Sequence, residues 1–474
     1  MASFVGSLIV LIVGYLIYGT IVEKVFGVDE ERVTPAVELN DGVDYVELPM
    51  WRIFLIQFLN IAGLGPIFGA VAGALWGPSA FLWIVFGSIF AGGVHDYLSG
   101  MLSVRNNGDS ISEIVGDYLG EGARKFMRVF SVILLILVGT VFMTGPADLL
   151  ANMTGLNLTT WVLIILAYYF VATVLPVDKI ISKFYPIFGA SLLIMAVGVG
   201  GGLIIGDYNI PNITLTNMHP ESLPIWPLLF VTIACGAISG FHATQSPLMA
   251  RCLKNEKDGR KVFYGAMIAE GVVALIWAAA AMTFFGGTVE LNTALAELGG
   301  PAGVVKNISD SMLGVTGGLL AMLGVVALPI SSGDTAFRSA RLILSDAFDL
   351  GQKPVKNRFK LAIPLFTIGA LLSQIDFDII WRYFAWSNQT LAMVALWAGA
   401  AYLLQHRKFH WIATIPATFM TAVSASYIMV APEGFGLSGS IGTPVGIIAA
   451  LLALTLFFLR QEAMTEQELE VATT

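Results

Sequence analysis

Two stretches of the sequence decide the fold, Asn60-Ile61-Ala62-Gly63-Leu64-Gly65-Pro66 and Ala234-Cys235-Gly236-Ala237-Ile238-Ser239-Gly240-Phe241-His242-Ala243-Thr244-Gln245-Ser246-Pro247. Each lies within an apolar segment long enough to cross a bilayer, which takes about 20 residues. Glycine weakens a helix and proline removes a backbone donor, so both segments are predicted to be interrupted helices. One such break is also typical of a kink or of close helix packing. Two breaks in corresponding places favour a functional site, because irregular backbone at this depth is tolerated only inside protein or along a cavity.

The composition places these segments in a membrane protein. The chain has 474 residues, of which 56% are hydrophobic and 12% charged, whereas soluble domains carry about 25% charged residues. The apolar runs are too long and too continuous for the strands of a membrane barrel, which alternate over about 10 residues. We therefore expect an all-α polytopic membrane protein, with the lipid bilayer as its surroundings and no nucleic-acid partner.

About thirteen apolar segments are predicted to cross the membrane: 4–22, 51–75, 80–103, 126–148, 159–175, 184–206, 226–250, 261–286, 314–344, 360–375, 378–404, 409–430 and 441–460. Between the third and fourth, residues 110–120 have the spacing of a short amphipathic helix. All but two of the 25 basic residues fall after odd-numbered segments or in the C-terminal tail; the exceptions are Lys306 and Arg382. The positive-inside rule then predicts a multi-pass plasma-membrane protein with its N-terminus outside and its C-terminus in the cytoplasm.

The two interrupted segments are the second and the seventh, and they enter the membrane from opposite sides. Residues 51–206 and 226–404 are therefore predicted to be two inverted halves of five helices each. Residues 1–50, a helix and a cytoplasmic loop, precede them, and residues 405–474, two helices and a polar tail, follow. This layout resembles the LeuT-type fold, a 5+5 inverted repeat, and it is typical of transporters that bind substrate near the middle of the membrane.

Four motifs give a more specific resemblance: Ala91-Gly92-Gly93-Val94-His95-Asp96-Tyr97, the run from Ala234 to His242, Gly333-Asp334-Thr335-Ala336-Phe337-Arg338-Ser339-Ala340-Arg341, and Phe384-Ala385-Trp386-Ser387-Asn388-Gln389. Together they resemble the carbon starvation protein A family, and the chain looks like a short member without the extra C-terminal spans. The resemblance implies ion-coupled import, under carbon starvation, of peptides or, with protons in some members, of pyruvate.

The breaks supply candidate residues for a substrate carboxylate, because the free amides at the N-terminus of a half-helix attract anions. Those proposed are Gly63, Leu64, Gly65, Gly236, Gly240, His242, Thr244, Gln245, Ser246 and Asn388. His242 could equally be a packing histidine, and Asn388 could hold helices together. The sequence has no acid within the breaks to pair with a peptide ammonium, which mildly favours a small anion, but both substrates stay open.

Acidic residues inside apolar segments are functional candidates because a charge in the bilayer centre is costly. In the LeuT-type fold the ninth segment and the first interrupted helix hold a sodium site, which here implies Ala62, Ser331, Ser332, Asp334 and Thr335. Asp334 could instead pair with Arg338, one turn along. Glu270, alone in the eighth segment, could hold a proton or bond to a neighbouring helix. The family favours protons, whereas the sixth segment lacks the central lysine of some proton-coupled relatives, so the coupling ion stays open.

Four residues are predicted to form a gate or a structural network near the cytoplasmic side: His95, Asp96, Arg105 and Arg338. Adjacent helical residues point about 100° apart, so His95 and Asp96 are not expected to face one partner. One could titrate near neutral pH and relay protons, while the other could pair with Arg105 or Arg338.

Other classes of protein fit less well. An enzyme needs a nucleophile with a base or a metal constellation, and the sequence has no GxSxG, no HExxH and no cofactor motif. A channel is disfavoured because the breaks mark two halves rather than a ring, and a primary pump because GxxxxGK[ST] is absent. The alternative within the transporter class is a sodium-coupled symporter of amino acids or organic anions, and the oligomeric state is left open.

Overall fold

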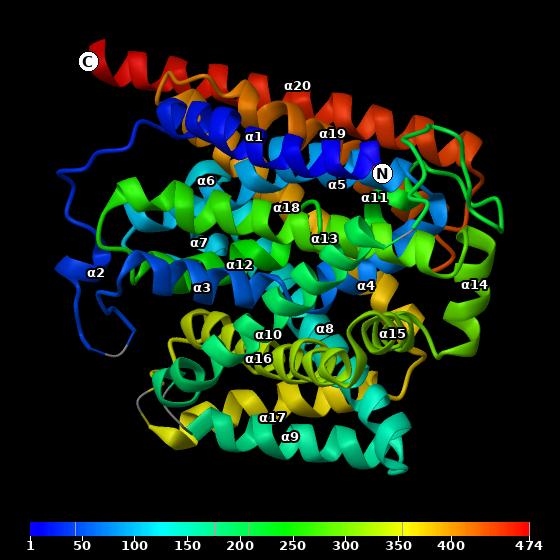
Figure 1. Cartoon of the computed structure of the whole chain (residues 1–474). Coiled ribbons are helices and arrows are strands. Elements are labelled where there is room, and N and C mark those ends of the chain that lie inside the picture. Colours follow the sequence, from blue (N-terminus) through cyan, green and yellow to red (C-terminus); the bar gives the residue numbers. More distant parts are fainter. Residues whose placement is uncertain (43, 175–176, 207, 353, 474) are drawn as a thin grey trace.

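The computed structural model describes residues 1–474 except 43, 175–176, 207, 353 and 474, and it leaves out the side chains of 152–153, 174–186, 321–322 and 461–473. Three lysines from the charge analysis, Lys179, Lys183 and Lys353, lie outside the described side chains. Every regular element in the described part is helical (Figure 1). The prediction of an all-α polytopic membrane protein is confirmed.

The first half of the chain contains α1 (Ala2–Phe26), α2 (Pro35–Glu38), α3 (Met50–Ile61), α4 (Leu64–Gly73), η1 (Ala74–Trp76), α5 (Ser79–Phe86), η2 (Gly87–Gly92), α6 (Gly93–Arg105), α7 (Ile111–Leu119), α8 (Glu121–Thr154), α9 (Leu158–Val174) and α10 (Val177–Ile205). The segment η2 is a π-helical turn between α5 and α6. The amphipathic helix expected at 110–120 is α7, and its apolar side packs against α8 and α18.

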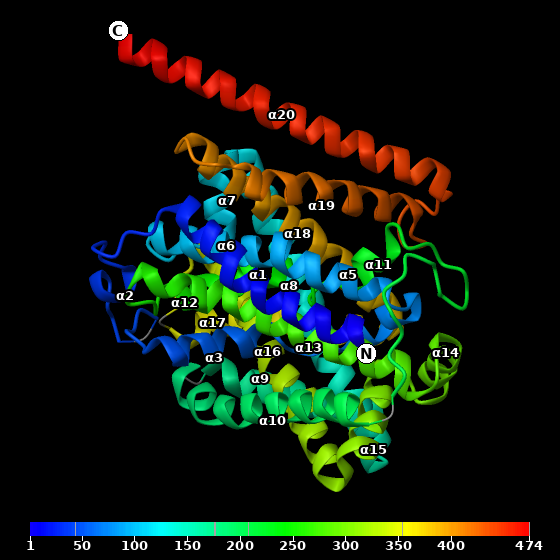
Figure 2. The same ribbon diagram turned by 45° about the horizontal axis from the view of Figure 1, so that its top comes forward.

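The second half contains α11 (Leu228–Thr232), α12 (Gly240–Ala250), η3 (Glu256–Asp258), η4 (Arg260–Tyr264), α13 (Gly265–Phe284), α14 (Thr288–Glu297), α15 (Pro301–Ala321), η5 (Met322–Ala327), α16 (Leu328–Ala347), α17 (Val355–Leu372), α18 (Phe377–Gln405), α19 (Trp411–Val430) and α20 (Gly439–Thr473). In both views α20 lies along one edge of the molecule beside α19 (Figures 1 and 2). Helix α12 contacts α3, α6 and α18.

All thirteen predicted segments coincide with helices or helix pairs. By length and apolarity, seven described helices are able to cross a membrane, or nine if each bent pair counts as one span. Residues 314–344 were predicted as one span, and the structure places a bend within them. The chain is already helical from Pro301, has a positive φ of 63° at Gly314, and bends by 51° between the helices on either side of residues 321–322.

Both interrupted helices break where the sequence predicts. The first break is Ala62–Gly63, where α3 and α4 meet at 48°. The second is longer, since residues 233–239 between α11 and α12 are not helical. The helices are interrupted at the glycine clusters because glycine lowers the stability of a continuous helix.

Glycines hold the two breaks against each other. A Cβ placed on Gly65 would lie 2.4 Å from Cys235 Sγ, and one on Gly69 would lie 2.9 Å from the carbonyl oxygen of Thr232. On the other side of the second break, a Cβ on Gly236 would lie 2.6 Å from the Cβ of Ala274. Half-helix α4 thus packs on residues 232–235, a contact that only small residues permit.

Substituting Gly65→Ala should destabilise the fold, because the added methyl overlaps the Cys235 side chain. Overpacking of this kind costs about 1–3 kcal/mol. The thermal unfolding midpoint of the purified protein in detergent measures the change. Gly6→Ala is the matched control, since a Cβ on Gly6 meets no atom within 4 Å; equal midpoints for the two variants would contradict the packing of the breaks.

Candidate functional site

Two backbone carbonyls of the second break accept hydrogen bonds from side chains of other helices. The indole N–H of Trp83 donates to the carbonyl of Ile233 over 2.9 Å, and the hydroxyl of Ser88 donates to that of Gly236 over 3.1 Å. Both donors come from α5 and the π-helical turn η2. Because buried backbone groups without partners are costly, these bonds allow the chain to leave the helical conformation at this depth.

Asn388 of α18 caps the half-helix α12. Its Oδ1 accepts from the backbone N–H of Phe241 over 2.9 Å and from the hydroxyl of Ser239 over 3.0 Å. The first turn of a helix has free amides, and Asn388 binds one of them from another helix. Within the described residues its Nδ2 has no acceptor, although the side chain is fully buried. Asn388 therefore holds the helices together and also retains an unused donor beside the break.

The other predicted substrate residues lie on or beside the breaks and are buried. Gly63 caps α4 and faces the ring of Phe142, and Leu64 begins that half-helix. Gly240 begins α12, where a Cβ would meet the backbone oxygen of Asn388 at 2.7 Å. Packing thus accounts for the absence of side chains at these glycines, while contact of their amides with substrate stays a prediction.

Three polar residues follow His242 on α12. The hydroxyls of Thr244 and Ser246 donate to backbone carbonyls of their own helix. The amide of Gln245 donates to Thr244 and, over 3.4 Å, to Ser339 of α16. Gln57 of α3, which the sequence analysis missed, points its amide to Ser246 over 3.5 Å. A polar side chain one turn before the Asn60 motif is the signal that could have identified it.

Three acidic and imidazole side chains from different helices meet just beyond the second break. Asp96 of α6 lies 2.9 Å (Oδ2) from His242 Nδ1 on α12, and His242 Nε2 lies 3.3 Å from Glu270 Oε2 on α13. All three side chains are 0% exposed. We call Asp96, His242 and Glu270 the buried triad. His95 Nδ1 adds a contact of 2.7 Å to Asp96 Oδ1.

The triad changes the expectations for its members. Pairing with Arg105 or Arg338 was considered for one of His95 and Asp96, and Asp96 does not make it, because both of its oxygens face histidines. His95 and Asp96, expected to have separate partners, contact each other. The two acids beside His242 also remove the argument that the region of the breaks lacks a carboxylate to receive a peptide ammonium.

Arg105 instead joins α6 to η3 and to the C-terminal end of α1. Its guanidinium contacts both oxygens of Glu256, at 3.0 and 2.9 Å, and donates to the carbonyl of Gly27 at the end of α1 over 2.7 Å. Glu256, in η3, is fully buried. Sequence reasoning missed it because many acids in cytoplasmic loops could have paired with Arg105.

The predicted coupling residues on α16 form a separate group. Asp334 lies 3.7 Å from Arg338, one turn along the helix, which is the pairing that was considered as its structural role. Ser331 and Thr335 donate their hydroxyls to carbonyls of the same helix, whereas Ser332 has no partner within the described residues. Ala62 lies in the first break and is buried. Whether these residues bind an ion stays a prediction.

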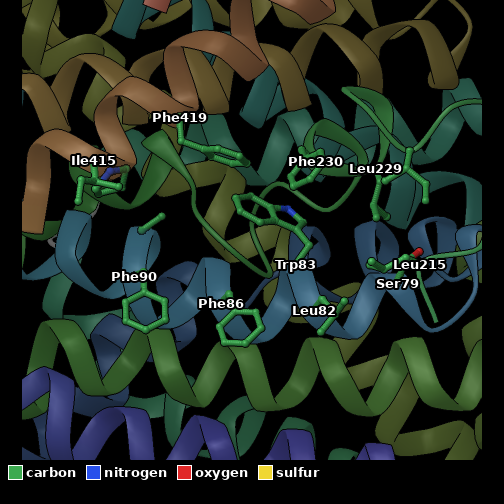
Figure 3. Close-up of a pocket in the computed structure, with 13 residues that line it drawn as sticks. Ser79, Leu82, Trp83, Phe86, Phe90, Leu215, Leu229, Phe230, Ile415 and Phe419 are labelled. Carbon is green, nitrogen blue, oxygen red and sulfur yellow. The ribbon is translucent and has the colours of Figure 1, made fainter. Parts of the chain in front are cut away.

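A groove of about 370 Å³ has none of the triad residues in its lining, and Figure 3 shows the side chains that form it. Its walls come from α5, η2, α11 and α19, and Trp83, Phe230 and Phe419 pack their rings together there. Phe86 and Phe90 line it and are about half exposed. Its apolar, open character suits the hydrocarbon region around the protein rather than a charged substrate.

Known proteins place this arrangement in a family. The family model described as Carbon starvation protein CstA matches residues 1–153 and 144–321. The peptide transporter CstA of Bacillus subtilis is 27% identical over 92% of this chain and 92% of its own length. The pyruvate/proton symporter BtsT of Escherichia coli is 29% identical over 75% of this chain and 59% of its own. A Haemophilus influenzae protein described as an uncharacterised membrane protein is 45% identical over 60% of this chain and 91% of its own.

Solved structures share the fold. A variant of the manganese transporter of Eremococcus coleocola superposes with a TM-score of 0.57 over 90% of this chain and 99% of its own, at 11% identity. At that identity the likeness concerns the fold alone. The two named relatives above are transporters, not enzymes.

The cap on α12 gives a testable consequence. Asn388→Ala should lower stability because it leaves the buried N–H of Phe241 and the hydroxyl of Ser239 without their acceptor, at a cost of about 1–3 kcal/mol. Thermal unfolding of substrate-free protein in detergent measures it. Asn212→Ala, which removes an exposed acceptor of the Ser3 hydroxyl, is the control; an unchanged midpoint for Asn388→Ala would refute the capping role.

Proposed function

Because the chain belongs to the carbon starvation protein CstA family, we propose that it is a secondary active importer of a carboxylate-bearing nutrient, a peptide or pyruvate. It works by alternating access and is driven by protons. The observation that carries the proposal is the buried contact between half-helix α4 and the second break, through Gly65 and Cys235. Half-helix ends at this depth are where inverted-repeat transporters bind substrate and ions.

The architecture we propose is the LeuT-type one. It has thirteen spans, with inverted halves at 51–206 and 226–404, one helix before them and two after. Support comes from the matching positions of the breaks, each in the first span of its half. Alternating access would then separate the halves on one side of the membrane at a time, with the substrate held between the breaks.

The chemistry of the breaks supports a carboxylate as the recognised group. Helices α4 and α12 each begin at a break, so their N-termini lie there, and helix N-termini attract anions. The amide Nδ2 of Asn388, fully buried and without an acceptor within the described residues, is a donor that a carboxylate oxygen would satisfy. His242, Thr244, Gln245 and Ser246 follow on the same half-helix.

Proton coupling is favoured over sodium by the buried triad, which brings titratable groups together two residues after α12 begins. The printed name of the Escherichia coli relative, a pyruvate/proton symporter, points the same way. The second candidate is a sodium-coupled symporter. It is favoured by the hydroxyls of Ser331, Ser332 and Thr335 around Asp334, which are ligands of the kind that sodium uses.

Uptake into proteoliposomes tests the function. Labelled pyruvate and a labelled dipeptide are offered separately, under an inward proton gradient, with and without sodium. We expect saturable accumulation of one of them that follows the proton gradient and continues without sodium. Accumulation that requires sodium and is lost in Asp334→Asn would support the second candidate instead. Glu290→Gln, which neutralises an exposed acid on α14, serves as control. Absence of gradient-driven uptake of both compounds would overturn the substrate assignment.

The orientation is tested with reporters fused after Thr474. Since almost all of the basic residues fall on the side assigned to the cytoplasm, we expect a green fluorescent protein at the C-terminus to be fluorescent and an alkaline phosphatase there to be inactive. The same reporters before Met1 should give the opposite pattern. Active phosphatase at the C-terminus would contradict the orientation, and the same reporter pattern at both termini would contradict the odd number of spans.

A further inference from the structure

The buried triad is unusual in its charge balance. Two carboxyl groups, Asp96 and Glu270, flank the single imidazole of His242, and the side chains of all three are 0% exposed. The imidazole of His95 contacts Asp96, and the Cys235 thiol in the break lies near His242. No arginine or lysine among the described residues contacts the three side chains, unlike Asp334 with Arg338 and Glu256 with Arg105.

The contacts determine how many protons this arrangement needs. Asp96 receives Nδ1 of His95 on one oxygen and Nδ1 of His242 on the other, so an ionised Asp96 places a hydrogen on each of these nitrogens. The remaining approach, from His242 Nε2 to Glu270 Oε2 at 3.3 Å, is an ion-pair distance at which neither atom has an aligned hydrogen-bond partner among the described residues, and one more proton on the pair makes it favourable. Without it a nitrogen lone pair would face a carboxylate oxygen in a dry interior, where such an arrangement is strongly unfavourable.

We propose that this single proton, shared between His242 Nε2 and Glu270 Oε2, is the proton that the transporter carries, and that it fastens half-helix α12 to α13. The inference rests on the proposed proton-coupled import and names the site of the coupling. When the proton leaves, Glu270 and His242 separate, and α12 loses this link to α13 while its contacts with Asp96 and Asn388 remain. The proton itself goes from the Nε2–Oε2 pair to water on the side to which the site has opened.

Movement of His242 would reach the substrate site directly. Helix α12 begins at Gly240, and His242 is its third residue. The residue between them, Phe241, donates its backbone N–H to the cap, Asn388. The break preceding α12 packs on α4 through Gly65 and Cys235. A shift of α12 therefore changes the position of both half-helix ends, and this links protonation to substrate binding.

A metal ion is the competing occupant for a histidine between two acids. The described residues contain no group of three or more His, Cys, Asp or Glu side chains placed to hold one. Asp96 contacts His242, and His242 contacts Glu270, so the three side chains form a row and do not converge on a common point. A row of this kind is the geometry of a proton relay.

The decisive variant is Glu270→Gln. Its amide can donate permanently to His242 Nε2, so it copies the protonated state and cannot release the proton. We expect exchange of labelled for unlabelled substrate across the liposome membrane to continue and to lose its pH dependence. Accumulation under a proton gradient should stop, leaving equal concentrations inside and outside. Glu290→Gln should behave as wild type, and Glu270→Asp, which keeps a titratable group, should restore part of the accumulation.

A spectroscopic test does not depend on the substrate. Infrared difference spectra between acidic and alkaline pH distinguish protonated carboxyl from imidazolium bands in the purified protein. We expect wild type and Glu290→Gln to show one titrating band, of either kind, that Glu270→Gln lacks. Identical spectra for wild type and Glu270→Gln would overturn the inference, as would gradient-driven accumulation by Glu270→Gln. Failure of the wild-type protein to import either substrate, with the band present, would overturn the proposed function and leave the proton site standing.

Discussion

Backbone hydrogen bonding inside a bilayer is the constraint on which this structure depends. In hydrocarbon every N–H and C=O group needs a partner within the protein, and residues 233–239 give up their helical partners at the centre of the fold. Trp83 and Ser88 donate to the carbonyls of Ile233 and Gly236 in this segment, and Asn388 accepts from the N–H of Phe241 just after it. These three side chains come from α5, η2 and α18, so the interruption is stable only when helices from both halves of the chain surround it.

The same requirement explains the π-helical turn. Residues 87–92 approach the second break so closely that a Cβ on Gly92 would lie 2.2 Å from the carbonyl oxygen of Ala237. The turn places Ser88 where it can bond to Gly236, while the hydroxyl of Tyr264 donates to the carbonyl of Ile89 within the turn. One irregular segment is thus supported by another, and α6, which carries His95 and Asp96, begins directly after it. The position of the acids relative to His242 follows from this support.

Much of the architecture could be predicted from the sequence because it depends on local properties. Apolar runs revealed the helices, and glycine and proline marked both breaks, at Ala62–Gly63 and at 233–239. The site was harder to predict, since its contacts join residues 146 and 28 positions apart, from Asp96 to His242 and from His242 to Glu270. Hydropathy shows that these residues are buried but not which helix faces which. The partner of Arg105 was missed for the same reason, and the bend near residues 321–322 because no proline or polar cluster marks it.

The contact between Gly65 and Cys235 makes the opening of the two breaks measurable by chemical labelling. The thiol lies under the backbone of α4 and is 2% exposed, so a maleimide can reach it only after the two half-helices have parted. Cys252, the other cysteine of the chain, is also buried but lies at the end of α12 and provides a separate reference. The rate at which maleimide alkylates Cys235 therefore reports how often α4 and the second break separate.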